Sequence, residues 1–77
     1  MTLSDAAPGA ICQVTGLDLP IGLSRRLEAL GMIEGSSVKI LRKKRRGAMI
    51  ITVRGTRFAV GLGIAKHISV KGGASVG

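Results

Sequence analysis

The sequence predicts a small, mainly β fold with one short helix, and three observations lead to this prediction. The chain has 77 residues, which is the length of one domain with one modest core. Its composition, 45% hydrophobic and 21% charged, is typical of a globular protein. Its β-rich runs are short and closely spaced by glycine-containing turns. This spacing indicates a small barrel, with a two-layer α+β sandwich as the alternative.

The N-terminal segment predicts one strand between two irregular regions. Residues 1–8 are expected to form a loose arm that ends in a Pro8–Gly9 turn. Residues 10–15 alternate between two sets of side chains with a period of two, which is typical of a strand. Residues 16–22 contain Gly, Asp and Pro, and they predict a loop.

The clearest helix is the segment LSRRLEALG, residues 23–31. Leu23, Leu27 and Leu30 recur at i, i+4 and i+7, so a helix would place them on one face. Gly31 follows the last leucine, where a helix ends most easily because glycine adopts the left-handed conformation without steric cost.

The second half of the chain predicts a hairpin followed by shorter elements. Residues 37–42 and 49–54 are β-rich, and a basic run with Gly47 separates them. The remaining expected elements are a Gly55–Thr56 turn, a short strand with Phe58 and Val60 on one face, a helical turn at 62–66, a closing strand at 67–70 and a flexible tail at 72–77.

The basic run RKKRR, residues 42–46, dominates the charge of the protein. Twelve Lys and Arg oppose four Asp and Glu, which gives a net charge of +8 and favours an anionic partner. Because both faces of a strand would be charged from Arg42 onward, we expect the hairpin to leave the body of the protein there. A solvated tip explains the run without a ligand, whereas an electrostatic contact with phosphate or acidic protein is the functional alternative.

The sequence predicts neither catalysis nor a cofactor. It contains no GxSxG, HExxH, GxGxxG or P-loop motif. The four carboxylates, at residues 5, 18, 28 and 34, show no pairing of the kind that acid–base chemistry needs. The start of the chain does not resemble a signal peptide, and the longest clean apolar stretch, residues 58–65, is too short to span a bilayer. We therefore expect a soluble, cytoplasmic, non-enzymatic protein.

Cys12 and His67 are the only good soft metal ligands in the sequence, and they are weak candidates for a site. A single cysteine excludes a disulfide within the chain, and a metal site needs three or four ligands. An iron-binding or iron-sensing protein is thus a disfavoured hypothesis. A small basic nucleic-acid-binding protein is the stronger alternative, although the one aromatic residue, Phe58, is expected in the core and leaves no platform for stacking bases.

At residues 26–38 the sequence RLEALGMIEGSSV, of the form RLxxLGMxxGxxV, resembles the signature of FeoA, the small cytoplasmic accessory protein of bacterial ferrous iron transport. The similarity extends over about residues 3–71 and includes VRGTRFAV and the closing HISV. The chain departs from the family pattern at the hairpin tip, where Gly47-Ala48-Met49 replaces a frequent Gly-Asp-Pro, and at GLGI before Ala65, where charged residues are common.

The resemblance implies an SH3-like β-barrel with a short α-helix inserted after the first strand, and a role as accessory to FeoB, the membrane transporter with a GTP-binding domain. A transient contact with an anionic membrane surface and a weak homodimer are further expectations. Exposure and charge select the residues expected to bind the partner, which are Arg25, Arg26, Met32, Arg42, Lys43, Lys44, Arg45 and Arg46.

Overall fold

Five antiparallel strands form one sheet in the order β4-β3-β2-β1-β5. The computed structural model describes residues 1–44 and 47–72. The strands are β1 (Ile11–Leu17), β2 (Ser37–Lys44), β3 (Ala48–Val53), β4 (Thr56–Gly61) and β5 (Ile68–Lys71). Helix α1 (Ile21–Ala29) follows the first strand, α2 (Leu62–Ala65) precedes the last, and a 3-10 helix, Leu3–Asp5, lies near the N-terminus.

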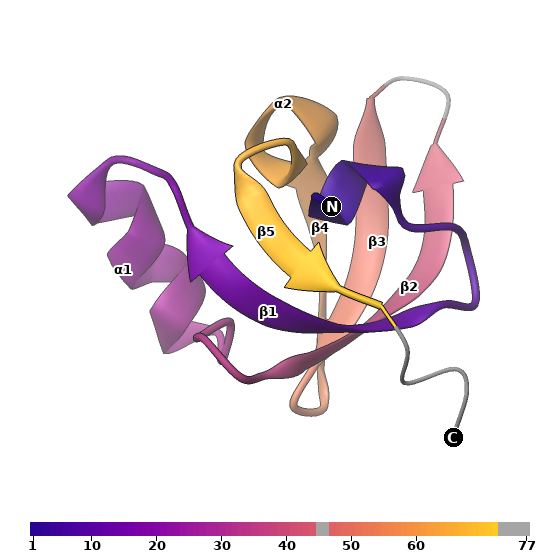
Figure 1. The fold of residues 1–77 in the computed structure, drawn as a ribbon, viewed down its shortest axis with the longest axis horizontal. Helices are drawn as coiled ribbons and strands as arrows, with labels where there is room; N and C mark the ends of the chain where they lie inside the picture. The colour runs from indigo at the N-terminus through magenta and orange to yellow at the C-terminus, as the bar shows by residue number, and fades with distance from the viewer. Residues whose placement is uncertain (45–46, 73–77) are drawn as a thin grey trace.

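The sheet is strongly curved, so that β1 and β5 lie in front of β3 and β4 (Figure 1). The core lies between these two halves, as expected of a small barrel. Alternate residues point into it, which produces the alternation of buried and other positions in β3, in β5 and in the first half of β2. The strand residues of the core are Cys12, Val14, Val38, Ile40, Met49, Ile51, Val53, Val60, Ile68 and Val70.

The predicted loose arm is wrong, because the N-terminal residues are docked on the barrel. Leu3 is 0% exposed and Ala6 is 2% exposed. The backbone N–H of Val70 donates to the carbonyl of Met1 at 2.9 Å, next to a bridge between Thr2 and Ser69. The 3-10 turn directs the side chain of Leu3 into the core, and this burial holds the segment in place. Of the predicted tail, residues 73–77 lie outside the described part of the chain.

Helix α1 begins two residues earlier than predicted and covers the core with only part of its leucine row. Leu27 is buried and Leu23 is half-buried, but Leu30 is 39% exposed. The reason is that regular helix ends at Ala29, so Leu30 is already the capping residue. Figure 1 shows α1 at the margin of the barrel.

The end of α1 confirms the predicted role of Gly31, which has φ +102°. Its N–H donates to the Glu28 carbonyl at 2.9 Å, and the N–H of Met32 donates to the Leu27 carbonyl at 2.9 Å. This pair of hydrogen bonds is the Schellman motif, which turns the chain back against the helix end. The turn places Met32 in the core with no exposed surface.

The hairpin between β2 and β3 is confirmed, but β2 is two residues longer than predicted and β3 is displaced by one residue. Pairing continues as far as Lys44 opposite Ala48, so Arg42 and Lys43 belong to the sheet and do not leave it. Arg45 and Arg46 lie outside the described residues. The next turn is also displaced by one residue, because Arg54 and Gly55 both have positive φ, as a two-residue type I′ hairpin requires.

Candidate interaction surfaces

The first candidate surface is the outer face of strands β2, β3 and β4. The side chain of Leu41 has no partner in the register between these strands, because a bulge lies between Ile40 and Arg42. A bulge inserts one extra residue and therefore reverses which side chains face the core. Arg42 then lies opposite Ile50 on the outer face, although simple alternation from the buried Ile40 would have turned it inward.

Three cations of this outer face share one concavity. Arg42, Lys44 and Arg57 line a groove of about 480 Å³ whose other lining residues are Leu41 and Ile50. Arg57 comes from β4, opposite Thr52, so the charges lie on both sides of the uncharged strand β3. We call this surface, with Lys39 opposite Thr52, the basic sheet face.

Lys43 differs from its two neighbours. It lies opposite the buried Met49, and its Nζ donates a hydrogen bond of 2.8 Å to the backbone carbonyl of Ser4. Its side chain therefore reaches over the N-terminal 3-10 helix instead of joining the basic sheet face. Strand alternation thus separates the described part of the predicted cluster into outward-facing Arg42 and Lys44 and a lysine that contacts the N-terminal segment.

The second candidate surface is the exposed side of α1. Arg25 and Arg26 are both exposed, as predicted. Ile21 precedes Arg25 by four residues and Leu30 follows Arg26 by four, so each arginine has an aliphatic neighbour on the helix surface. Ile21 is 71% exposed and Leu30 is 39% exposed. We call these four residues, with Ile33 at 40% exposure, the α1 surface.

Met32 is the one predicted binding residue whose assignment the structure contradicts. The side chain has 0% exposed surface, because the Schellman turn folds it beneath α1. A residue in this position stabilises the fold and offers no surface to a partner.

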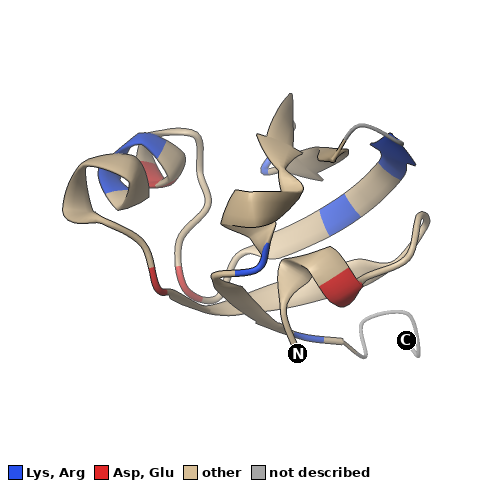
Figure 2. Cartoon of the chain, turned by 90° about the horizontal axis from the view of Figure 1, so that it is seen from above, with Lys and Arg blue, Asp and Glu red and all other residues tan. Residues whose placement is uncertain are grey.

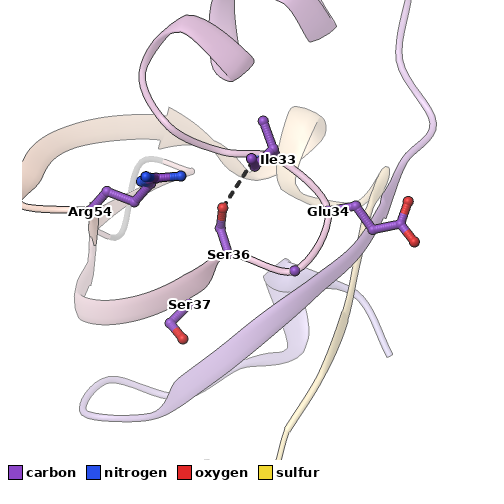
Figure 3. Close-up of a pocket in the computed structure, with 6 residues that line it drawn as sticks. Ile33, Glu34, Ser36, Ser37 and Arg54 are labelled. Atoms are coloured by element: carbon purple, nitrogen blue, oxygen red, sulfur yellow. Dashed lines mark hydrogen bonds between the residues drawn. The ribbon is translucent and has the colours of Figure 1, made fainter.

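A cleft of about 450 Å³ lies beside the α1 surface and was not anticipated from the sequence. In Figure 3, Arg54 points from the β3–β4 turn toward Ile33, whereas Glu34 points to the other side of the loop. The hydroxyl of Ser36 fixes this loop, because it donates to the Gly31 carbonyl at 2.8 Å and accepts from the Ile33 N–H at 3.3 Å. In the sequence, the glycines were the only indication that this loop turns tightly.

The two weak metal candidates are not brought together. Cys12 is 1% exposed, and burial raises the pKa of its thiol. His67 is exposed and lies beside the other end of β1, where its carbonyl accepts the Asp18 N–H at 2.8 Å. Within residues 1–44 and 47–72, no group of three or more His, Cys, Asp and Glu is arranged to hold a metal ion.

The carboxylates are segregated from the basic sheet face. Figure 2 shows acidic positions on α1, in the loops that flank it and in the N-terminal 3-10 helix. These are Glu28, Asp18, Glu34 and Asp5, respectively. Residues 37–61, which include all of β2, β3 and β4, contain eight of the twelve Lys and Arg and no Asp or Glu.

Within the described residues, no helix has the length and apolar character needed to cross a bilayer.

Comparison with known proteins assigns this architecture to a family. The FeoA domain family matches residues 1–72. A protein of Methanocaldococcus jannaschii, named as a candidate Fe(2+) transport protein A, is 33% identical over 69 residues, which are 90% of this chain and 83% of the relative.

Two solved structures show the same fold. The FeoA protein of Chlorobium tepidum has a TM-score of 0.90 at 28% identity, over 96% of this chain and 71% of that one. The zinc complex of Stenotrophomonas maltophilia FeoA, described as a procaryotic SH3 domain protein, has a TM-score of 0.79 at 30% identity, over 92% and 89%. The predicted SH3-like barrel with a helix after its first strand is confirmed, and the chain belongs to the FeoA family, whose members are small accessory proteins of ferrous iron transport.

Proposed function

We propose that this protein is a non-enzymatic, cytoplasmic accessory protein that binds a FeoB-type ferrous iron transporter through the α1 surface. The observation that carries the proposal is the combination of side chains on that surface. Exposed apolar side chains that gather on one surface mark protein interaction sites, and arginine is enriched among the residues that contribute most to binding. The exposed large hydrophobic residues of the described chain are Met1, Ile21, Leu30 and Ile33, and three of these four lie on the α1 surface.

The position of α1 supports this role. The helix lies at the margin of the barrel and contributes Leu27 and Ser24 to the buried part of the protein. Its opposite side is therefore available to a partner without disturbing the core. Arg25 and Arg26 favour an acidic partner surface, since each guanidinium can form two parallel hydrogen bonds with one carboxylate.

The test is binding of the purified protein to the detergent-solubilised transporter. We expect Ile21→Ser and the double variant Arg25→Ser with Arg26→Ser each to weaken binding at least roughly fivefold, because a truncated anchor typically costs more than 1 kcal/mol. Lys66→Ser with Lys71→Ser is the matched control, since both lysines are exposed and the change in net charge is the same. Equal binding by all these variants would contradict the role of the α1 surface.

A further inference from the structure

We propose that the basic sheet face is an electrostatic docking surface for an anionic lipid bilayer. It would orient the protein with β2, β3 and β4 toward the membrane. The inference rests on the proposed function in one respect, which is that an accessory of a transporter works beside a membrane. The binding surface itself is separate from the α1 surface, and the lipid contact is testable without any transporter.

The charge distribution is the first argument. Lys39, Arg42, Lys44 and Arg57 are exposed, and the register of the strands places all four on the outer face. No carboxylate lies on these three strands to neutralise them, since residues 37–61 contain no Asp or Glu. Clusters of four or more basic residues near a membrane attract anionic headgroups, and each contributes about fivefold to the binding constant.

The opposite side of the molecule is the second argument. Asp18, Glu28 and Glu34 lie on α1 and in the loops that flank it, away from the basic sheet face (Figure 2). Because Arg25 and Arg26 offset most of this negative charge, a negatively charged bilayer would attract the basic sheet face strongly and the α1 side only weakly. The charge distribution therefore favours one orientation, and that orientation leaves α1 accessible to a protein partner.

The chemistry of the basic sheet face favours lipid over the other anionic partners. The exposed large hydrophobic residues of the described chain all lie elsewhere, so this face lacks the apolar anchors that protein interfaces use. Its aliphatic groups, Leu41 and Ile50, are half-buried beneath the cations. The one aromatic residue, Phe58, lies opposite the buried Ile51 and therefore turns away from this face, which leaves no platform for stacking bases.

Rigidity is the last argument. Hydrogen-bonded pairs of the β2–β3 and β3–β4 ladders hold the backbone beneath these charges. Because the bulge at Leu41 fixes which residues face outward, Arg42 and Lys44 emerge on the same side as Arg57. Charges carried by a preformed backbone can contact several headgroups at once, without the cost of ordering a flexible segment.

The experiment measures binding of the full chain to phosphatidylcholine vesicles with and without phosphatidylglycerol, over a series of salt concentrations. We expect binding only to the vesicles with phosphatidylglycerol, and weaker binding as salt screens the charges. The variant Arg42→Ser with Arg57→Ser should bind roughly 25-fold more weakly. The matched variant Arg25→Ser with Arg26→Ser carries the same net charge and should bind at most a few-fold more weakly.

Orientation is tested by labelling, which also covers the case of a variant that folds poorly. Cys12 is buried, so an environment-sensitive fluorophore can be attached selectively to a cysteine introduced at Ala59 or at Ala29. Ala59 lies opposite Ile50 on the basic sheet face, and Ala29 lies on α1. We expect a blue shift on adding anionic vesicles with the Ala59→Cys label and no shift with the Ala29→Cys label.

Three results would overturn the proposal. They are no binding to phosphatidylglycerol vesicles at low salt, equal losses in the two double-arginine variants, and tighter binding to polyglutamate or duplex DNA than to the vesicles at the same ionic strength. Loss of transporter binding in the Arg25→Ser and Arg26→Ser variant bears only on the α1 surface. The two proposals can therefore fail independently.

Discussion

Replacing Met32 tests whether this residue of the family motif belongs to the core or to a binding surface. Met32→Ala removes three heavy atoms from a side chain that is 0% exposed. Truncations of this kind cost about 2–5 kcal/mol, through the lost burial and the cavity left behind. A domain of this length is stabilised by roughly 4–12 kcal/mol in total, so the substitution should remove a large part of that free energy.

The assay is urea denaturation of wild type and variants, followed by circular dichroism, with thermal melts in parallel. We expect the melting temperature of Met32→Ala to fall by at least about 8 °C, since a small domain loses about 4–8 °C per kcal/mol. Leu30→Ala is the neighbouring control and should cost less than about 1 kcal/mol, because Leu30 is 39% exposed. Met32→Leu conserves volume and should retain both stability and transporter binding. Similar, small losses in Met32→Ala and Leu30→Ala would refute the placement of Met32 in the core.

Three further predictions concern single residues. Gly31→Ala should destabilise the protein by about 1–3 kcal/mol in urea titrations, because φ is +102° and the new Cβ would lie 3.0 Å from Arg54 Cδ. Gly35→Ala, with φ +93° and open space around it, should cost no more than Gly31→Ala, and a larger loss would be inconsistent with that contact. Hydrogen bonds from the backbone N–H and the hydroxyl of Thr2 lower the pKa of Asp5. The stabilising effect of this carboxylate is therefore present above the ordinary carboxyl pKa and disappears as pH falls through the folded-state value. Asp5→Asn should therefore melt below wild type at neutral pH and together with it in strong acid, whereas a pH-independent difference would exclude this origin. Cys12 should react with a thiol reagent in the native state only through opening of the protein, since burial shields the thiol and raises its pKa. Rapid labelling of the folded protein would show that the thiol is accessible.

Local sequence signals account for most of the fold. Alternation with a period of two indicated β1, in which the set that contains Cys12 and Val14 is the buried one, and a β-rich run indicated β3. Gly31 marked the end of α1, because only its neighbours along the chain decide whether a left-handed residue can terminate the helix. The positions of these elements could thus be predicted within a few residues.

The features that were predicted wrongly from the sequence depend on contacts between distant segments. Leu3 lies in a short segment with no periodic apolar pattern, and its burial follows from the packing of the 3-10 helix against β5 and α2. The sequence around Met32 is compatible with an exposed or a buried side chain, and only the Schellman turn decides between them.

The composition of the candidate interaction surfaces was only partly predictable for the same reason. The charges of residues 42–44 were evident, but which of them face outward depends on the bulge at Leu41. Simple alternation gives the opposite result. Ile50 and Arg57 join Arg42 only through the pairing of three strands, so no linear pattern places them in one groove.

The measurement that tests the account most directly is binding of the full chain to the solubilised FeoB-type transporter of its own organism, with random duplex DNA as the competing anion in the same salt series. The account predicts that the transporter remains bound at physiological ionic strength while the DNA is released, since apolar anchors are insensitive to screening and phosphate contacts are not. Retention of DNA with no binding to the transporter would contradict it. In that case the basic sheet face would recognise nucleic-acid phosphate, and the proposed transporter partner would be wrong.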